Sequence, residues 1–429
     1  MLTTCLERPI DQTENLMNRL FFWSLTSALA GFLFGFDTVV ISGAEQKIQA
    51  LWALSGNMHG WAMSAALWGT VLGSLIGGWP TDRFGRKKTL IAIGILYFVS
   101  AVWSAMANDV ISFIIARSIG GLGVGISTVA APLYISEIAP PDKRGRLAGM
   151  FQFNIVFGIL IAFLSNALIG GSGESDWRWM LGIEAIPAVL YAVLCLGIPE
   201  SPRWLLTKAK DRANGLKVLG MIDPGASEAE LSGRAKVIEQ AAASQTSSHG
   251  FWSGRLKIPI LLAFLIAFFN QLSGINAILY FAPRIFEMTG LGEKAALLQS
   301  VGIGVTNLIF TFVGLWLIDR LGRRTLLYIG SFGYIFSLGL CALIWVFISE
   351  IFPNQFRANG QSLGSATHWV FAATLTYVFP IVVTKFPAWT VFLFFCIMMV
   401  LQLIWVKLMV PETKGVALED MEKQLGVNS

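Results

Sequence analysis

The sequence predicts an all-α membrane protein with two pseudo-symmetric halves. Three observations lead to this fold class: a composition too apolar for a soluble protein, long apolar segments separated by short polar loops, and charge motifs that recur in the second half of the chain. Together they predict two bundles of membrane-spanning helices, one from each half, that face each other across a central site.

The composition excludes most classes of soluble protein. Of the 429 residues, 55% are hydrophobic and 13% are charged. A soluble domain has about 45–50% apolar residues even with glycine counted, and about 25% charged residues. Folded in water, this chain would expose too much apolar surface. A cytosolic enzyme, a nucleic-acid-binding protein and a disordered scaffold are therefore excluded, and a polytopic membrane protein remains.

The apolar segments are long enough to cross a bilayer, because a helix needs about 20 mostly apolar residues to span a hydrocarbon core of about 30 Å. Eleven segments satisfy this rule. They are 20–43, 59–80, 88–107, 110–135, 146–169, 177–198, 258–289, 295–318, 325–349, 361–385 and 387–410.

Positive charge in the short loops predicts the orientation, because cytoplasmic loops carry the excess of Lys and Arg. The second loop contains Arg83, Arg86, Lys87 and Lys88, whereas the first contains Lys47 alone. The fourth and eighth loops are basic as well. We expect the N-terminus and the even-numbered loops to face the cytoplasm, in a multi-pass protein of a bacterial inner membrane.

One polar stretch, 199–257, is long enough to fold outside the membrane. Its apolar residues alternate with charged ones in a pattern typical of short amphipathic helices. We therefore divide the chain into an N-terminal six-helix bundle (1–198), a cytoplasmic linker of amphipathic helices (199–257) and a C-terminal bundle (258–429).

Three motifs recur between the two halves. Residues 82–87 recur as 319–324, residues 134–144 as 347–357, and residues 199–201 as 411–413. Each pair is similar in its charges and in its spacing. An internal repeat of this kind indicates two halves of similar structure.

The repeat is shorter in the second half. Asp82 and Glu137 are 55 positions apart, but Asp319 and Glu350 are only 31 apart. About one helix is therefore shortened or missing, and the C-terminal bundle is expected to be incomplete. A single span cannot return to the side that it left. Either Thr325–Ser349 does not cross the membrane normally, or the chain from Glu350 onward is inverted.

The carboxylates and arginines of the recurring motifs can form a latch that closes the cytoplasmic side. Arginine holds a carboxylate through two parallel N–H groups, and the motifs offer the pairs Glu137–Arg144, Glu200–Arg203 and Glu350–Arg357. The alternative is a set of solvated loop charges worth less than about 1 kcal/mol each, and the repetition in both halves favours the latch. The candidate latch residues are Asp82, Arg83, Arg86, Glu137, Arg144, Glu200, Arg203, Asp319, Arg320, Arg323, Glu350 and Arg357.

Charge inside the predicted spans is scarce, and Asp37 and Arg117 are its clearest examples. Each costs about 2.5–3.5 kcal/mol at a helix centre unless it is paired or hydrated. The pair can be a purely structural salt bridge. We favour the alternative, in which Asp37 binds a proton more or less tightly depending on whether Arg117 is near, and so couples proton entry to conformational change.

Polar and aromatic residues inside the spans suggest a site for a neutral ligand with many hydroxyl groups. Amides both donate and accept hydrogen bonds, and aromatic rings pack on the C–H faces of sugars. For any one residue, a simple helix–helix hydrogen bond is the alternative. The candidate ligand-binding residues are Phe34, Gln152, Asn270, Gln271, Asn276, Tyr280, Asn307, Trp345 and Trp369. We expect His368 to be an interior hydrogen-bonding residue and not a metal ligand.

Five motifs are specific enough to suggest a family. They are Asp82-Arg83-x-Gly85-Arg86-Lys87, Pro132-x-Tyr134-x-x-Glu137-x-x-Pro140-x-x-x-Arg144-Gly145, Pro199-Glu200-Ser201-Pro202-Arg203-Trp204, Gln271-x-x-Gly274-x-Asn276-x-x-x-Tyr280 and Pro411-Glu412-Thr413-Lys414-Gly415. With them the chain resembles, over nearly its whole length, the sugar porter family of the major facilitator superfamily, with about one transmembrane helix shortened or missing in the C-terminal half.

The resemblance implies the major facilitator two-bundle fold of twelve helices, of which about 11 are recognisable here. It also implies roles for individual residues. Tyr280 would lie at the extracellular gate, and Asp37 and Arg117 would form the coupling pair of proton-linked members. Asn270 stands where the family usually has Gln, and Ile159 where a bacterial xylose–proton symporter has Gln. The positions expected to contact sugar are Gln152, Gln271, Asn276, Asn307, Trp345 and Trp369.

The expected function is secondary active transport of a hexose or pentose by alternating access, coupled to proton symport. One alternative is a sugar uniporter, and another is a non-transporting relic or sugar-sensing receptor, because of the missing helix. No nucleophile–base pair or metal-ligand cluster is visible, so we expect no enzymatic activity, no cofactor and no metal. The expected partners are a monosaccharide, a proton and the lipid bilayer, with no nucleic acid, and the protein is expected to be a monomer.

Overall fold

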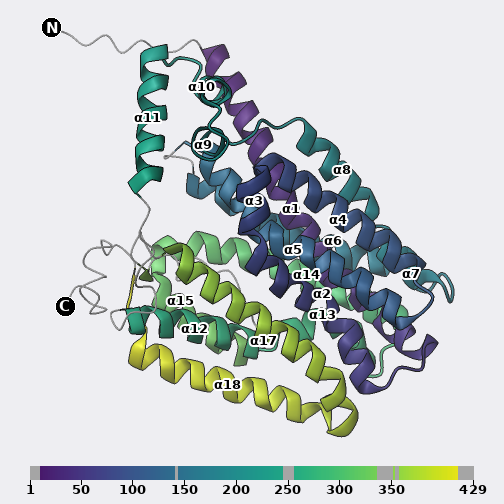
Figure 1. Ribbon diagram of the computed structural model, residues 1–429. Coiled ribbons are helices and arrows are strands. Elements are labelled where there is room, and N and C mark those ends of the chain that lie inside the picture. The colour runs from purple at the N-terminus through teal and green to yellow at the C-terminus, as the bar shows by residue number, and fades with distance from the viewer. Residues whose placement is uncertain (1–9, 141–143, 245–255, 336–350, 353–356, 414–429) are drawn as a thin grey trace.

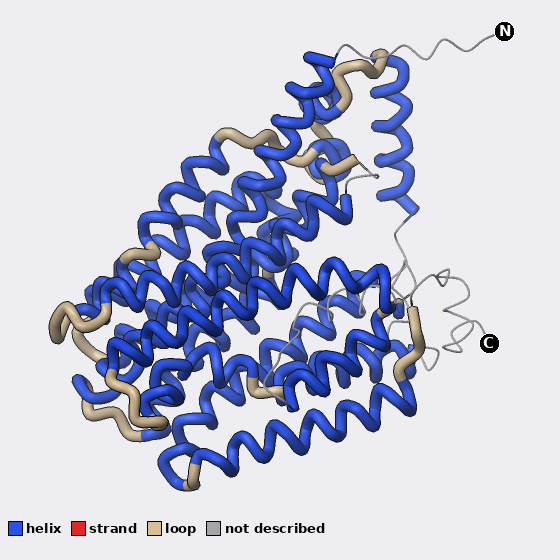
Figure 2. The backbone as a smooth tube through the Cα atoms, turned by 180° about the vertical axis from the view of Figure 1, so that it is seen from behind, coloured by secondary structure: helices blue, strands red, loops and turns tan. Residues whose placement is uncertain are grey.

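The computed structural model describes residues 10–140, 144–244, 256–335, 351–352 and 357–413. Regular structure in these ranges is entirely helical (Figure 2). The first half of the chain forms eight helices. They are α1 (Ile10–Leu51), α2 (Gly56–Ile76), α3 (Gly78–Phe84), α4 (Arg86–Met106), α5 (Val110–Ile138), α6 (Arg144–Ile169), α7 (Asp176–Gly182) and α8 (Ala185–Leu196).

The helix starts in this half follow local capping chemistry. The side chains of Ser55 and Asp109 accept the N–H groups of Met58 and Ser112, which caps α2 and α5. Small residues then allow the helices to pack closely. At Gly121 of α5, a β-carbon would meet the backbone of α2 at Ala66, so only glycine fits there.

The second half forms α12 (Lys257–Leu272), α13 (Ile275–Glu287), α14 (Glu293–Leu321), α15 (Arg323–Ile335), α17 (Arg357–Lys385) and α18 (Ala388–Met409). Helices α12 and α13 together form one broken span. The break lies at Gly274, whose φ of 86° is a left-handed conformation that glycine adopts without strain.

The linker forms three short helices, α9 (Pro202–Thr207), α10 (Arg212–Ile222) and α11 (Glu228–Ser244). They cover one end of the molecule, at the upper left of Figure 1. We call this the linker end. The other end, which carries the loops 52–55, 170–175 and 288–292, we call the opposite end.

Nine helical segments of the described residues are long and apolar enough to span a membrane, or ten if the bent pair α2 and α3 counts as one span. The two helices of that pair meet at 51°. The predicted span 325–349 lies only partly within the described residues, as α15. The predicted count of eleven therefore stays a prediction, while the all-helical membrane fold is confirmed.

The helices that follow the shortened segment are not inverted relative to the first half. Glu412, just after α18, accepts the N–H of Arg324 at the start of α15 (3.1 Å). Glu200, just after α8, likewise accepts the N–H of Arg86 at the start of α4 (2.9 Å). Of the two alternatives from the repeat, inversion from Glu350 onward is therefore wrong. The remaining one, an abnormal crossing by 325–349, concerns residues that lie mostly outside the described ranges.

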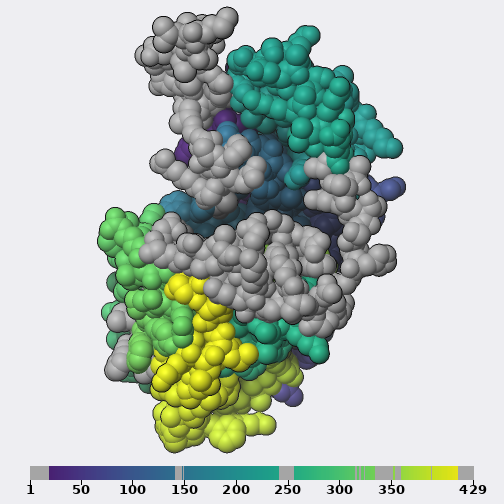
Figure 3. Space-filling view, turned by 90° about the vertical axis from the view of Figure 1, so that its left-hand side faces the viewer, coloured from purple at the N-terminus to yellow at the C-terminus, as the bar shows by residue number. Residues whose placement is uncertain are grey.

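Core packing differs between the two ends. At the opposite end, one hydrophobic cluster contains residues from both halves, such as Met63 of α2 and Phe281 of α13. Two other clusters are separate: one belongs to the first half, around Tyr97, and one to the second half, around Trp405. Figure 3 views the side that carries α11, where the linker (teal) and the first half (blue) lie above the green and yellow parts of the second half. The described halves therefore share a core only at the opposite end.

Candidate functional site

Asp37 of α1 and Arg117 of α5 form a buried ion pair. The Arg117 Nη1 group donates to Asp37 Oδ1 at 2.5 Å, and Nη2 donates to the Asp37 backbone oxygen at 2.9 Å. Both residues are at most 2% exposed. Charges inside a membrane are tolerated when they are paired, and the structure brings together the two residues that the sequence singled out.

A second acid, Glu184, lies beside this pair and was missed by the sequence analysis. It is 1% exposed and interacts electrostatically with both Asp37 and Arg117. Its Oε1 atom has no hydrogen-bond partner among the described residues. An acid within the predicted span 177–198 is itself a signal of function, so Glu184 was visible in the sequence.

An amide cluster is formed around the break between α12 and α13. Asn276 Nδ2 donates to Gln271 Oε1 at 2.6 Å, and Gln271 Nε2 donates to Asn270 Oδ1 at 3.0 Å. A ring nitrogen of His368 lies 2.8 Å from Gln271 Nε2, close enough to accept its N–H. Because the chain turns at Gly274, Gln271 and Asn276 face the same interior space from two different helices.

The aromatic wall next to this cluster contains residues from both halves. The rings of Phe34 of α1 and Trp369 of α17 are 5.3 Å apart. Trp369 is 3% exposed, and its Nε1–H group has no acceptor among the described residues. A buried N–H group without an acceptor is costly, so this donor is available to a ligand.

The remaining predicted ligand-binding residues are less tightly placed. Gln152 of α6 and Asn307 of α14 are half-buried, on two helices that pack against each other. Trp345 lies outside the described residues. The structure thus groups Phe34, Trp369 and the amide cluster, and the contribution of every one of these positions to ligand binding stays a prediction.

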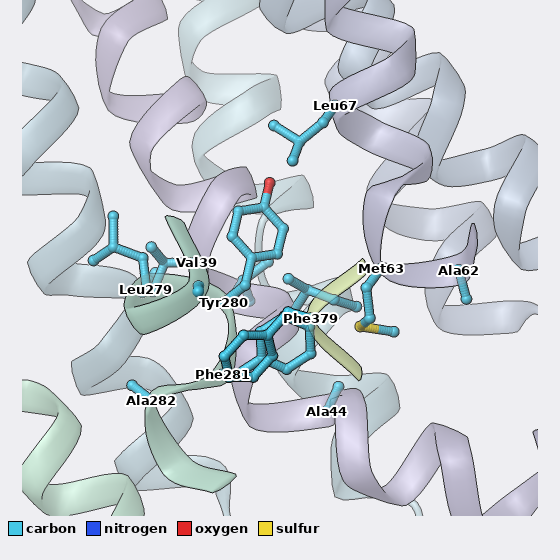
Figure 4. Close-up of a cluster of buried hydrophobic side chains, with 14 of the residues drawn as sticks. Val39, Ala44, Ala62, Met63, Leu67, Leu279, Tyr280, Phe281, Ala282 and Phe379 are labelled. Carbon is cyan, nitrogen blue, oxygen red and sulfur yellow. The ribbon is translucent and has the colours of Figure 1, made fainter. Parts of the chain in front are cut away.

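Tyr280 of α13 connects the two halves. It is 1% exposed, and its hydroxyl lies beside Thr38 of α1 and interacts electrostatically with Asp37 and Arg117. In Figure 4 its ring points toward Leu67. The neighbouring Phe281 ring stacks on Phe379 at 4.6 Å between centroids. These rings fill the space between the amide cluster and the opposite end.

The charge motifs at the linker end pair within the first half. Arg86 donates to both oxygens of Glu137, at 2.8 Å each, and to Asp82 Oδ1 at 3.2 Å. Lys208 of the linker also pairs with Asp82, at 3.0 Å. The sequence suggested that Glu137 pairs with Arg144, whereas the structure pairs Glu137 with Arg86.

The sequence suggested that Glu200 pairs with Arg203, but the structure gives it other partners. Its carboxylate accepts the backbone N–H groups of Arg86, Lys87 and Ser201. Burial raises the pKa of the Glu200 carboxyl, and these N–H groups oppose the rise. The carboxylate therefore serves as a cap for the start of α4.

The other latch candidates make fewer described contacts. Arg83 and Arg203 are exposed, and Arg320 lies over the Trp316 ring at 4.0 Å. The side chains of Arg144, Asp319, Arg323 and Arg357 and the whole of Glu350 lie outside the description.

The charged groups at the opposite end were also missed. Lys47 of α1 pairs with Asp176 of α7 at 2.6 Å and with Glu293 of α14 at 2.7 Å. Arg284 of α13 pairs with Glu45 of α1. Within the part of the chain that the structure describes, the ion pairs between the two halves lie at this end. The same part holds no group of three or more His, Cys, Asp or Glu side chains suited to a metal.

Comparison with known proteins agrees with this architecture. The family model described as "Sugar (and other) transporter" matches residues 23–338 and 332–425, and the two matches meet where the repeat is shortened. The chain is 33% identical over 455 residues to the arabinose-proton symporter of Bacillus subtilis, covering 97% of each protein. It is 32% identical over 478 residues to the D-xylose-proton symporter of Escherichia coli K12, covering 94% of this chain and 95% of that protein.

Solved structures match along the same length. The inward open conformation of the xylose transporter XylE from E. coli superposes with a TM-score of 0.81 and 29% identity, covering 94% of this chain and 99% of XylE. The structure of the proton:xylose symporter XylE bound to 6-bromo-6-deoxy-D-glucose gives a TM-score of 0.76 at 30% identity, covering 95% and 99%.

Proposed function

The chain belongs to the sugar porter family of the major facilitator superfamily, and we propose that it moves a monosaccharide, a hexose or a pentose, together with a proton across the membrane. The relatives named as arabinose-proton and D-xylose-proton symporters support both this substrate class and this coupling. The family is one of transporters, which supports a role in transport over one in catalysis.

The observation that carries the proposal is the buried Asp37–Arg117 pair with Tyr280 of the other half beside it. When Asp37 binds a proton, its carboxyl loses the charge that holds Arg117. Glu184, the second buried acid of the same cluster, interacts with both Asp37 and Arg117 and so lies within reach of this change. Proton binding therefore changes the contacts that α1 makes with α5 and, through Thr38 and Tyr280, with α13.

The sugar site is proposed to lie between the amide cluster and the aromatic wall. Gln271 and Asn276 supply donors and acceptors for hydroxyl groups, and Trp369 supplies both a ring face and a donor that has no acceptor among the described residues. Phe34 would close the site from the first half. Asn270, Gln152, Asn307 and Trp345 are proposed to complete it.

The conformation is proposed to be inward-facing. We assign the linker end to the cytoplasm, because it carries the basic loop with Arg83, Arg86 and Lys87. The halves share a core at the opposite end, which would be the extracellular one. The TM-score of 0.81 with the inward open conformation of XylE supports the same state.

The candidate latch residues are proposed to act in the outward-facing state, in which the linker end is closed. In the inward-facing state, Arg86, Glu137 and Asp82 pair within the first half. When the linker end closes, the equivalent motif of the second half would approach them and new pairs could form across the gap. We further propose that the protein works as a monomer in a bacterial inner membrane, with the N-terminus in the cytoplasm and the domain division at 1–198, 199–257 and 258–429.

Two other functions are the alternatives. A uniporter would use the same sugar site without proton coupling, and a non-transporting sugar receptor would fit the spacing of 31 positions between Asp319 and Glu350, where the first half has 55. A receptor would bind sugar but show no exchange of labelled sugar across vesicle membranes.

Transport in proteoliposomes tests the proposal. We expect the wild type to accumulate labelled sugar when the outside is acidic, and to exchange labelled for unlabelled sugar without a pH gradient. Asp37→Asn should lose accumulation but keep exchange. Accumulation that persists in Asp37→Asn would contradict coupling through this residue, and binding without exchange in the wild type would support the receptor.

A further inference from the structure

A buried charge cluster at the opposite end joins the two halves. Arg284 of α13 donates from Nε to Glu45 Oε1 and from Nη2 to Glu45 Oε2, both at 2.7 Å. The Glu45 side chain on α1 is fully buried, while that of Arg284 is 14% exposed. Arg284 Nη2 also donates to Gln49 Oε1 at 2.5 Å. Arg284 of α13 thus makes a bidentate contact with Glu45 of α1, and the Arg284 side chain extends toward the surface.

His59 of α2 is the third member of the cluster. Its Nε2 atom lies 2.8 Å from Glu45 Oε2, and its side chain is fully buried. A carboxylate can only accept hydrogen bonds, so Nε2 carries the hydrogen and Nδ1 carries the lone pair. Nδ1 has no hydrogen-bond partner among the described residues. Nδ1 is therefore the atom at which His59 can bind a proton.

The surroundings of His59 contain few other charges. Among the described residues, the charged groups paired with it are Glu45 on α1 and, through Glu45, Arg284 on α13. Its ring meets the Phe281 ring edge-on, with 6.4 Å between the ring centroids. The pairs that Lys47 makes with Asp176 and Glu293 form a separate cluster. Lys47 is two residues beyond Glu45, or about 200° around the helix, so it projects from the other face of α1.

We propose that Glu45, His59 and Arg284 form a proton-operated lock between the halves, held closed while His59 is neutral and released when His59 binds a proton. Glu45 and His59 belong to the first half and Arg284 to the second. With His59 neutral, separating the halves leaves the Glu45 carboxylate with no cation. With His59 protonated, Glu45 keeps a cationic partner after separation, and the two cations repel each other.

The direction in which pH would shift this lock suits a symporter. Acid on the outer side favours opening toward that side, where proton and sugar are to be collected. The inference rests on the proposed alternation of the two halves and not on the identity of the sugar. It also assigns a proton-binding site separate from Asp37. The lock can therefore be tested in an Asp37→Asn protein, in which position 37 cannot bind a proton.

Distance measurements by electron paramagnetic resonance test the lock. Spin labels at Ser172→Cys and Met288→Cys, both exposed at the opposite end, report the separation of the halves. The background carries Asp37→Asn and alanine at the four native cysteines, in lipid nanodiscs without sugar. Between pH 8 and pH 5.5 we expect the ratio of open to closed populations to rise at least about fivefold, the lower end of usual coupling.

Single substitutions distinguish the lock from a general effect of pH on the protein. His59→Gln should stay closed at both pH values, and Arg284→Gln should be open at both, whereas His249→Gln, which removes a different histidine, should respond as the parent does. If His59→Gln does not fold, His59→Asn carries the same test. A full pH response in the His59 variant, an Arg284→Gln protein as closed as its parent, or a parent without any pH response overturns the lock. None of these readouts depends on sugar transport, so a failure of the lock can be distinguished from a failure of the proposed transport activity.

Discussion

Tyr280 of the second half lies beside Asp37 of the first half and beside Thr38, the next residue along the chain. Tyr280 is also one helical turn from Asn276 on α13, so the two side chains share a face of that helix. A single side chain thus touches the surroundings of both the proposed proton site and the proposed sugar site. This contact offers a short route by which the occupation of one site can alter the other.

Tyr280→Phe tests that route. The ring and its packing remain, but the hydroxyl group beside Thr38 and Asp37 is lost. We expect the dependence of sugar affinity on pH to shrink by half or more, while the affinity at pH 5.5 stays within about twofold, because one neutral hydrogen bond contributes about 1 kcal/mol or less. Binding calorimetry between pH 5.5 and pH 8 measures both quantities.

The matched control for that variant is Tyr191→Phe. Tyr191 is a buried tyrosine of α8 whose hydroxyl lies in the separate core of the first half. Its removal should leave the pH dependence of sugar affinity as in the wild type. An equal loss in both variants would show a general effect of losing a buried hydroxyl, and no specific coupling through Tyr280.

Trp369→Phe tests the unsatisfied indole donor. The substitution keeps an aromatic ring near Phe34 but removes the Nε1–H group. If a sugar hydroxyl accepts from that group, the Kd for sugar should rise by about three- to tenfold, which corresponds to one hydrogen bond of about 0.5–1.5 kcal/mol. Fluorescence or calorimetric titration of the purified protein measures the change.

Trp405→Phe is the control, since its Nε1–H group is also buried and without an acceptor among the described residues. Trp405 packs on Phe269 in the core of the second half and has no predicted contact with sugar. Sugar affinity should not change in this variant. An unchanged Kd in Trp369→Phe would remove the indole group from the proposed site.

Glu200→Gln tests the cap at the start of α4 through the pH dependence of stability. Burial raises the pKa of Glu200 above its ordinary value of 4.5, so the folded protein binds this proton more tightly than the unfolded chain does. Its contribution to stability is then fully present below pH 4.5 and is lost as pH rises through the raised pKa. The Tm of the wild type minus that of Glu200→Gln should therefore fall as pH rises from 4.5.

Asp211→Asn provides the comparison for that measurement. A hydrogen bond with Asn214 lowers the pKa of the exposed Asp211 carboxyl below 3.8. Its contribution is then constant above about pH 4.5, and the Tm difference between wild type and Asp211→Asn should not change over the same range. A Tm difference for Glu200→Gln that is also constant would mean that Glu200 does not titrate there.

Much of the fold could be predicted, because membrane helices must be long and apolar. Segments such as 110–135 and 361–385 correspond to α5 and α17 within a few residues. The bend between α2 and α3 and the break at Gly274 could not be predicted, since they depend on how the backbone packs against neighbouring helices. The course of 325–349 could not be predicted either, because a shortened repeat fits more than one path.

The part of the candidate site that could be predicted is the part in which a buried charge requires a partner. Asp37 and Arg117 lie deep in apolar segments, so each requires a partner, and they proved to be partners of each other. Glu45 was missed because the first span was predicted to end at 43, whereas α1 continues to Leu51. Arg284 was missed because it lies near the end of the predicted span 258–289. A charge near a span end looks solvated in the sequence, and only the packing of the other half buries it.

Proton flux driven by sugar is the measurement that tests the central claim most directly. Liposomes holding the protein and a pH-sensitive dye are exposed to an inward sugar gradient with no initial pH difference. We expect the interior to acidify as sugar enters, and Asp37→Asn to abolish this acidification while sugar still equilibrates. Sugar entry without acidification in the wild type, or acidification that survives in Asp37→Asn, would contradict the account.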